Sequence, residues 1–361
     1  MKVNKVKLTS FRNYQKEEIS FERGINLIYG SNASGKTNLV ESIALLSLGK
    51  SFRTNEEENL INKESSFAKV EIELEKNKKI DLQMIISKNG KKIYCNEIPL
   101  EKLSELSGIL IAITFIPEDV FLFKDSPNVR RRSIDICLAN LYRRYIYYLS
   151  EYKSYLKQRN ALLKEENISL DLLKIFEEKM IENQYHIVIQ RNELFKGLEN
   201  KINLIFKKIS LKEDSIKIKY QTDFLINSNY EEFKKDALKK YEENRENDLR
   251  RKSSSIGIHK DDFIVYLNEK DISLFGSQGQ NRLVSLSLKL AYGELVKEVI
   301  NDDPVLILDD VLSELDETHQ TSLINALLDY EQVFITSAMK EENKNIKCLY
   351  QVDNGAVIRR K

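Results

Sequence analysis

Apolar and polar positions near the start of the chain predict two strands and one early helix. Residues 3–8 alternate between apolar and polar side chains, which is typical of a strand. Residues 24–30 form a short apolar run that ends in glycine and predict a buried strand. Residues 36–48 carry apolar side chains at helical spacing, so a helix is expected soon after that strand.

Further strand signals follow. Residues 67–95 alternate along their length and predict a β-meander. Within them, Asn89-Gly90 is a dipeptide that favours a tight hairpin turn. Residues 109–116 are almost entirely apolar, which predicts another buried strand.

The middle of the chain has the periodicity of helices. From about residue 130 to 210, apolar side chains recur every three or four positions, which predicts two amphipathic helices packed antiparallel. Residues 220–251 are strongly charged, and we expect them to be helical as well. Strand character returns at Ile256, and residues 256–361 alternate strands with helices.

The pattern predicts an α/β protein with a split domain. Residues 1–115 and 256–361 are expected to form one mixed domain, with residues 116–255 inserted as a helical domain. The insert is too short to be the long coiled-coil arm of the large chromosome-organising ATPases.

Composition argues against several classes of protein and of binding site. The chain has 361 residues, with 57 Lys and Arg against 56 Asp and Glu. Any DNA binding must therefore come from local basic patches. Its three cysteines form no CxxC pair, which argues against disulfides and a zinc site. No signal-peptide core or membrane-length apolar run is present, so a cytoplasmic protein with no membrane partner is expected.

One motif predicts phosphate binding. Between the predicted strand and helix the chain matches G-x-x-x-x-G-K-[ST] in full, with the residues Gly30, Ser31, Asn32, Ala33, Ser34, Gly35, Lys36 and Thr37. Backbone N–H groups and the helix N-terminus would face phosphate oxygens. Lys36 would reach the β- and γ-phosphates of ATP, and Thr37 would bind Mg²⁺. A glycine turn with a chance lysine is the alternative.

An apolar strand ending in two carboxylates suits metal-assisted phosphoryl transfer. Residues 305–310 end in Asp309 and Asp310. Asp309 would hold Mg²⁺ directly or through water, and Asp310 would orient or deprotonate the attacking water. Solvated acids at a strand end are the alternative. Asp316 follows where ABC-type ATPases carry a loop that crosses a dimer interface.

A third segment distinguishes among ATPase classes. Ser277, Gln278 and Gly279 precede a helix and resemble the ABC signature, which binds the γ-phosphate of ATP on the opposite subunit. Such a signature implies a head-to-tail dimer with ATP in its interface. The alternative is a glycine turn before an amphipathic helix.

Several motifs in order resemble the RecF family of ABC-type ATPases. They are residues 8–14, 30–43, 50–54, 115–119, 127–132, 257–262, 277–282 and 308–316. The resemblance implies an ABC-type ATPase head, or lobe I, built on a phosphate-loop α/β core, and a helical lobe II. It also implies an ATP-dependent homodimer that binds gapped DNA or junctions of single and double strands.

The resemblance further implies DNA repair, replication and the SOS response, with RecO and RecR helping to load RecA. The chain departs from related ATPases at some positions. Asp310 stands where ABC transporters carry glutamate, which predicts slow turnover, and Thr336 lies near the position of their switch histidine. No Q-loop glutamine is evident. A transporter subunit and an SMC- or Rad50-like scaffold ATPase remain alternatives.

Basic clusters are the candidate DNA contacts. The candidates are Arg130, Arg131, Arg132, Arg143 and Arg144, with Arg250, Arg251 and Lys252 as a further patch. Each could instead be part of a solvated helix face. The tyrosines of the helical region are expected in the core rather than as base-stacking platforms. His186 is expected to be structural, and His259 is unassigned.

Overall fold

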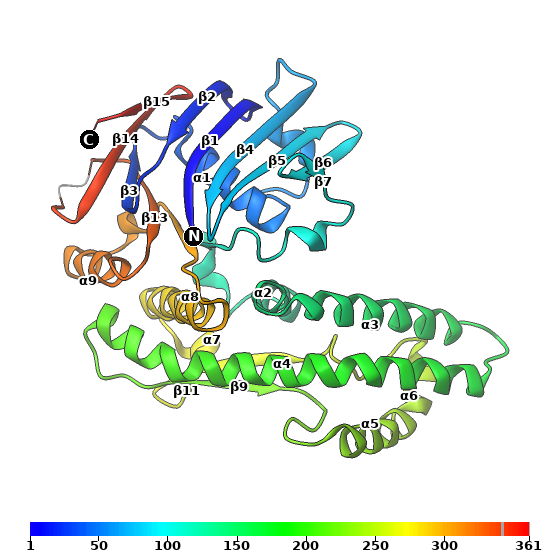
Figure 1. Cartoon of the computed structure of the whole chain (residues 1–361). Coiled ribbons are helices and arrows are strands. Elements are labelled where there is room, and N and C mark those ends of the chain that lie inside the picture. The colour runs from blue at the N-terminus through cyan, green and yellow to red at the C-terminus, as the bar shows by residue number, and fades with distance from the viewer. Residues whose placement is uncertain (341–342, 361) are drawn as a thin grey trace. The chain divides into compact units, whose positions relative to one another are not determined.

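The computed structural model describes residues 1–340 and 343–360, which form two compact units (Figure 1). Unit 1 comprises Met1–Val120, Leu204–Glu213 and Arg282–Lys361. Unit 2 comprises Phe121–Asn203 and Asp214–Asn281. The expected domain boundary at 255/256 therefore differs from the division in the structure, where residues 256–281 belong to unit 2.

A mostly parallel sheet forms the centre of unit 1. It has six strands in the order β15-β14-β3-β13-β12-β8, and only β15 is antiparallel to its neighbour. Every residue of β12 and β13 is buried, as expected for strands covered on both faces. The bounds are β3 (Gly24–Tyr29), β8 (Ala112–Phe115), β12 (Val305–Asp309), β13 (Gln332–Ser337), β14 (Ile346–Asp353) and β15 (Ala356–Arg359).

A second, antiparallel sheet contains the predicted meander. Its order is β2-β1-β4-β5-β6-β7, and Asn89-Gly90 forms the predicted hairpin between β5 and β6. The bounds are β1 (Lys2–Phe11), β2 (Tyr14–Ser20), β4 (Phe67–Glu75), β5 (Lys79–Ser87), β6 (Gly90–Cys95) and β7 (Ile98–Pro99).

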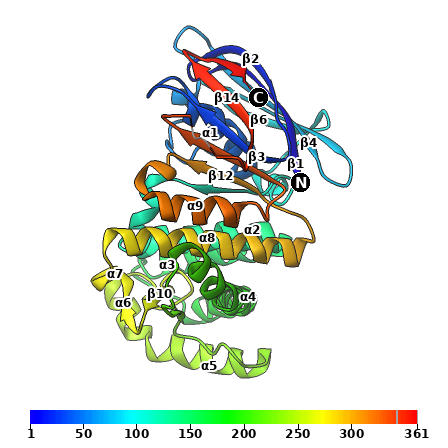
Figure 2. The ribbon, with the colours of Figure 1, turned by 90° about the vertical axis from the view of Figure 1, so that its left-hand side faces the viewer.

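Helix α1 (Lys36–Leu48) lies between the two sheets (Figure 2). It contacts β8, β12 and β13 of one sheet and β4 and β5 of the other. Residues 39–47 are all buried, so the helix is enclosed on every side rather than amphipathic. This burial fixes the segment that follows the phosphate loop.

Unit 2 combines long helices with a small sheet of order β11-β10-β9. The predicted first amphipathic helix is broken at Tyr142, whose φ and ψ of −129° and 103° are extended. The prediction of helix from residue 220 was wrong at its start, because Tyr220 belongs to β9 and pairs with Phe263 of β10. This pairing also explains why residues 256–281 join unit 2.

Except for α9, which lies wholly in unit 1, the remaining elements lie in unit 2 or extend from it into unit 1. They are α2 (Pro127–Leu141), α3 (Arg143–Leu162), α4 (Leu170–Ser210), β9 (Ile216–Gln221), α5 (Tyr230–Glu243), α6 (Arg245–Arg251), β10 (Asp262–Leu267), β11 (Lys270–Asp271), α7 (Ile272–Phe275), α8 (Gln278–Ile300) and α9 (Glu317–Leu327). Among the described residues, no helix is long and apolar enough to cross a membrane.

Buried ion pairs connect the elements of unit 2. Arg191 of α4 donates to Asp261 at 2.7 Å and to Asp135 of α2 at 2.9 Å. The Tyr220 hydroxyl donates to the same Asp261 carboxylate at 2.5 Å. Removing one member would leave an uncompensated buried charge, so the network specifies how the helices and β9 meet.

His259 forms a half-buried polar contact in unit 2. Its Nδ1 lies 2.8 Å from the Tyr152 hydroxyl and its Nε2 lies 3.3 Å from the Ser254 carbonyl oxygen. A carbonyl can only accept, so Nε2 carries the proton and Nδ1 accepts from Tyr152 in the neutral ring. Burial lowers the pKa of His259 to about 4.

We expect this histidine to make stability depend on pH. The unfolded chain binds a proton near pH 6.5 whereas the folded chain does not until about pH 4. Stability is therefore complete above pH 6.5 and falls between pH 6.5 and 4, by at most about 3 kcal/mol. His259→Gln should flatten that part of the curve, measured by urea unfolding at a series of pH values. An unchanged slope would show that His259 does not carry this dependence.

Candidate nucleotide-binding site

Two glycines shape the phosphate loop between β3 and α1. A Cβ atom at Gly30 would lie 2.2 Å from the carbonyl oxygen of Val352 in β14. Gly35 has a φ of 121°, and a Cβ there would lie 2.6 Å from Nδ2 of Asn13. Both positions therefore exclude a side chain. Ala33 adopts a φ of 66° without being glycine, a conformation that costs about 1–2 kcal/mol.

The loop presents a cation and a free hydroxyl. Ser31, Asn32 and Ala33 are exposed, whereas Ser34 is buried and its Oγ has no hydrogen-bond partner in the described part of the chain. The Lys36 ammonium donates to the carbonyl oxygens of Gly30 and Ser31, both at 2.8 Å. Burial lowers the pKa of Lys36, against the attraction of two nearby aspartates. Such donors suit an oxyanion.

Asp309 is the buried carboxylate of the site, with 6% of its surface exposed. Its Oδ1 accepts hydrogen bonds from the hydroxyls of Thr37 at 2.9 Å and Thr336 at 2.7 Å. The Thr336 hydroxyl in turn accepts from the backbone N–H of Asp310 at 2.9 Å. Burial raises the pKa of Asp309, and the two threonine hydrogen bonds oppose that rise.

Parallel strand pairing brings these residues together. Asp309 at the end of β12 is in register with Thr336 of β13. Ser337, the next residue of β13, is in register with Tyr29, the last residue of β3. Since the carboxyl ends of neighbouring parallel strands meet at one edge of a sheet, the acidic strand and the phosphate loop share that edge.

The oxygen atoms around Thr37 and Asp309 fit a magnesium ion. Mg²⁺ in phosphate sites is held by one or two carboxylates together with phosphate oxygens and water. Across residues 1–340 and 343–360, no group of three or more His, Cys, Asp or Glu side chains could hold a metal. A bound ion would therefore need further oxygens from nucleotide and water. Asp310 is exposed, with a φ of 53° that aspartate tolerates.

Residues that the motifs did not assign individually support the loop. Asn13 Nδ2 donates to the Ser34 carbonyl and the Tyr14 hydroxyl to the Gly35 carbonyl, both at 2.9 Å. Asn38 Nδ2 donates to Asn13 Oδ1 at 2.8 Å. The resemblance included Asn13 and Tyr14, but their role depends on a hairpin folding onto the loop, which spacing alone does not indicate.

A buried acid organises the polar cleft beside the loop. Arg12 makes a two-pronged contact with the Glu41 carboxylate, at 3.0 and 2.8 Å, and Ser51 Oγ donates to it at 2.5 Å. Arg53 lies 3.6 Å from Glu41 and donates to Asn38 Oδ1 at 2.8 Å. Arg12, Arg53 and Asn38 also line an open cleft in unit 1.

The predicted signature lies in unit 2, whereas the phosphate loop lies in unit 1. Ser277 Oγ accepts from the Gln280 N–H at 3.2 Å, and the Gln280 side chain accepts from the Ser277 N–H at 2.9 Å. This reciprocal cap begins α8 at Gln278. No atom lies within 4 Å of a Cβ built at Gly279, so packing within the chain does not require glycine there.

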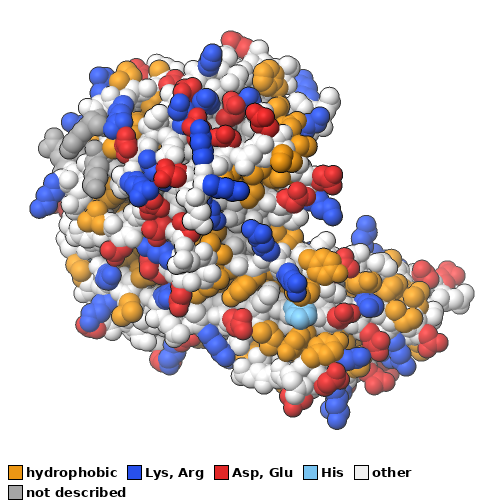
Figure 3. All heavy atoms as spheres, viewed as in Figure 1, with side chains coloured by type: hydrophobic (Ala, Val, Ile, Leu, Met, Phe, Trp, Pro, Cys, Tyr) orange, Lys and Arg blue, Asp and Glu red, His pale blue; other side chains and the backbone are white. Residues whose placement is uncertain are grey.

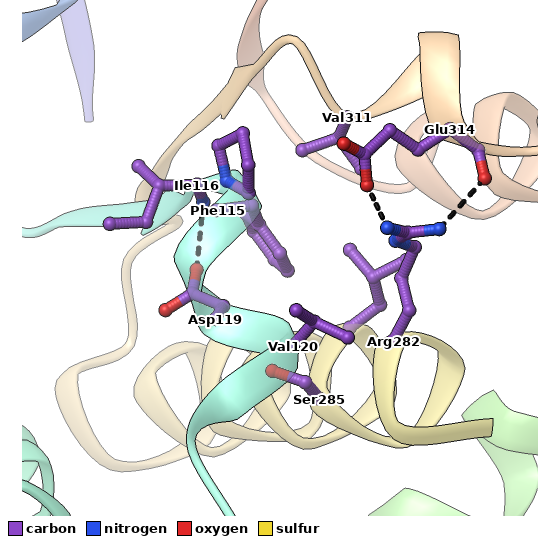
Figure 4. Close-up of a pocket in the computed structure, with 10 residues that line it drawn as sticks. Phe115, Ile116, Asp119, Val120, Arg282, Ser285, Val311 and Glu314 are labelled. Carbon is purple, nitrogen blue, oxygen red and sulfur yellow. Dashed lines mark hydrogen bonds and ion pairs between the residues drawn. The ribbon is translucent and has the colours of Figure 1, made fainter. Parts of the chain in front are cut away.

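Asp316 and the segment before it are held within unit 1. Asp316 caps α9, accepting from the His319 N–H at 2.9 Å, and its other oxygen lies 2.6 Å from the His319 ring. These contacts lower the pKa of Asp316. Arg282 forms an ion pair with Glu314 and donates to its carbonyl oxygen at 2.9 Å, beside a small pocket (Figure 4). Glu314 is thereby tied to Arg282 of α8 within unit 1.

The candidate DNA-binding arginines divide into two groups. Arg130 makes a bidentate contact with Asp262, and Arg131 donates to the Asp261 carbonyl at 2.6 Å. Arg132, Arg143 and Arg144 are exposed, and no described residue forms an ion pair with them. Only the second group has its charge free of intramolecular partners.

Comparison with known proteins identifies the family. The profile of the RecF/RecN/SMC N terminal domain matches residues 2–357. The chain is 38% identical over 370 residues to the DNA replication and repair protein RecF of Clostridioides difficile, covering 99% of this chain and 98% of that protein. It is 37% identical over 373 residues to that of Bacillus subtilis, covering 99% and 100%. The chain belongs to the RecF family.

Solved structures agree with this assignment. The recombination mediator protein RecF-ATP in the RecFOR pathway superposes with a TM-score of 0.91 at 31% identity, covering 99% of this chain and 97% of that one. The Smc head domain of Pyrococcus furiosus matches with a TM-score of 0.58 at 17% identity, which shows a shared fold alone. The ABC-type ATPase fold predicted from the RecF resemblance is confirmed.

Substitution by alanine at Gly30 and at Gly279 should change the free energy of unfolding by different amounts. Gly30→Ala places a Cβ against the Val352 carbonyl, so we expect a loss of about 1–3 kcal/mol in the free energy of unfolding. Gly279→Ala meets no atom and lies in a helix, so stability should change by less than about 1 kcal/mol. Urea unfolding checks both variants, and equal losses would contradict the geometry.

Proposed function

We propose that this chain is an ATP-binding DNA repair and replication protein, in which ATP and Mg²⁺ control DNA binding and are hydrolysed slowly. The hydrogen-bonded junction of Thr37, Asp309 and Thr336 beside the phosphate loop carries the proposal. It joins a metal-binding hydroxyl, a buried carboxylate and a strand end in the arrangement that phosphoryl-transfer sites use. Membership in the RecF family supports the repair role.

ATP would hold two copies of the chain together as a homodimer. Lys36 and the loop amides of one copy would bind the phosphates, and Ser277, Gln278 and Gly279 of the second would contact the γ-phosphate. Asp316 of the adjoining loop would lie near the same nucleotide. The exposure of residues 277–280 and the open space around Gly279 support this role, since no contact among the described residues requires a glycine there. A nucleotide bound only by the dimer stabilises it by about 2.7 kcal/mol at 100 times its Kd.

Slow hydrolysis follows from the chemistry of two adjacent acids. Asp309 would bind Mg²⁺, and the exposed Asp310 would orient the attacking water. Asp310 is one methylene shorter than glutamate and so reaches less far toward a water. A long-lived ATP state suits a switch better than a motor.

DNA gaps and junctions between single and double strands are the proposed substrates, in the cytoplasm. The solved RecF structures are described as part of a RecFOR pathway, which supports RecO and RecR as partners. RecA loading is proposed as the outcome. The likeness to an Smc head extends to the fold alone and gives no specific support for a scaffold. Arg132, Arg143 and Arg144 are the available cations for phosphate contacts.

Analytical ultracentrifugation with ATP, ADP or no nucleotide tests the proposal, with and without gapped DNA. We expect dimers and DNA retention only with ATP and Mg²⁺. Lys36→Ala should abolish both, because it removes the phosphate-binding ammonium. Gly279→Ala should weaken the dimer while leaving ATP binding by the monomer intact. Unchanged DNA retention by Lys36→Ala would separate the nucleotide from the function.

Asp310→Asn should trap the ATP-bound state. Asparagine keeps the size and tolerates the φ of 53°, but cannot accept a proton from water. We expect phosphate release to fall by about 100-fold or more and the DNA-bound dimer to persist longer. A variant that stays monomeric in saturating ATP and Mg²⁺ would contradict the proposed gating.

A further inference from the structure

A strip of aromatic rings runs across the helices of unit 2, with one ring exposed and four half-buried. Tyr147 and Tyr148 of α3 lie with ring centroids 5.7 Å apart, and Tyr148 stacks on His186 of α4 at 4.2 Å and 15°. His186 in turn contacts Tyr185, which contacts Tyr230 of α5, both at 5.4 Å. We call these five residues the aromatic strip. A continuous series of ring contacts at the surface differs from isolated exposed aromatic residues.

The strip is open to solvent at Tyr147. The expectation that tyrosines of this region lie in the core is confirmed for Tyr145 and Tyr152, which are 0% and 1% exposed. Tyr147 instead has 61% of its surface exposed. Hydrophobic side chains gather beside Lys and Arg over the long helices of unit 2 in Figure 3. Packing in the core therefore explains the tyrosines on the buried face of α3, but it does not explain Tyr147.

Two cations lie one helical turn before the exposed Tyr147 and the half-buried Tyr148. Arg143 and Arg144 precede Tyr147 and Tyr148 by four residues each, so each pair shares a side of the helix. Tyr148, which Arg144 precedes by four residues, stacks on His186, so Arg144 lies on the side of α3 that carries the aromatic strip. The first turn of α3 contains no acidic residue, so both arginines oppose the helix dipole. An anion would relieve that repulsion.

The nearby acids leave Arg143 and Arg144 without an ion pair, although the Glu182 carboxylate also acts on the His186 ring. Glu182, the exposed acid nearest His186 along α4, is paired with Lys179 at 3.2 Å. Neither Arg143 nor Arg144 forms an ion pair with any described carboxylate. Burial lowers the pKa of His186, Glu182 opposes that change, and the Arg144 charge adds to it.

We propose that the aromatic strip, with Arg143 and Arg144, binds single-stranded nucleic acid by stacking an unpaired base on Tyr147 while the arginines contact the adjoining phosphates. This inference rests on the proposed function and assigns a site to the single-stranded side of its DNA substrate. Exposed rings beside cations are how proteins bind single strands without reading sequence. Paired bases offer no free face, so a duplex would use the arginines alone.

A unique fluorophore tests the stacking directly, because the chain contains no tryptophan. Tyr147→Trp in the full-length chain, with ATP and Mg²⁺, is titrated with oligothymidylate of about 20 nucleotides, an abasic strand of the same length and a blunt duplex. Anisotropy of each labelled DNA reports total binding in parallel. We expect quenching of tryptophan emission by oligothymidylate only.

Affinity measurements on truncated variants complete the test. Tyr147→Ala should weaken oligothymidylate binding by about 5- to 100-fold and leave duplex binding nearly unchanged. Tyr147→Phe should keep the oligothymidylate affinity of the unmodified chain, because stacking requires the ring and not the hydroxyl. Phe67→Ala, which removes an aromatic side chain 42% exposed in unit 1, is the matched control and should have no effect.

The outcomes separate the two proposals. Oligothymidylate binding without tryptophan quenching, or equal quenching by the abasic strand, would overturn base stacking at Tyr147 and leave the proposed function intact. Failure of the unmodified chain to bind any of the three DNAs would overturn both. Equal loss of duplex binding in Tyr147→Ala would indicate a general fold defect and contradict a single-strand site.

Discussion

The site in unit 1 depends on how one buried carboxylate is satisfied. Asp309 is 6% exposed, and its Oδ1 accepts from hydroxyls on two other elements, Thr37 of α1 and Thr336 of β13. A buried acceptor without partners costs about 1–3 kcal/mol, and more when charged. The two threonine hydroxyls therefore reduce the free-energy cost of burying the Asp309 carboxylate. Three segments distant in sequence are held in one geometry as a result.

The surrounding fold makes this geometry rigid. Helix α1 is enclosed by two sheets, so Lys36 and Thr37 at its start cannot shift without disturbing packing on both sides. The opposite end of the loop is fixed by Gly30, which leaves no room for a Cβ against Val352. A polar loop fixed at both ends is pre-organised, so binding a phosphate would order few further groups.

Local sequence signals predicted the parts of the site that a single segment determines. Helix α1 begins at Lys36 as expected. Strand β3 ends beside the phosphate loop and β12 ends at Asp309, because apolar runs and glycines mark those boundaries. The contribution of Thr336 required knowing that β13 lies between β3 and β12, which is long-range pairing. The break at Tyr142 has no proline or glycine to signal it. The strand at residues 216–221 depends on pairing with β10, some 40 residues away.

The sequence does not determine which arginines are paired with acids within the protein. Along the chain, Arg130, Arg131, Arg143 and Arg144 all fall within the same predicted helical region, so the sequence does not distinguish them. In the structure, Asp262 and the Asp261 carbonyl engage the first two, and these acids follow them by about 130 residues. An arginine whose donors are already used within the protein gains little from a phosphate, since binding must first break a charge-assisted bond. Arg143 and Arg144, which form no ion pair among the described residues, precede the exposed Tyr147 and the half-buried Tyr148 by one helical turn. This combination of unsatisfied charge and exposed aromatic surface distinguishes a binding surface from a solvated helix.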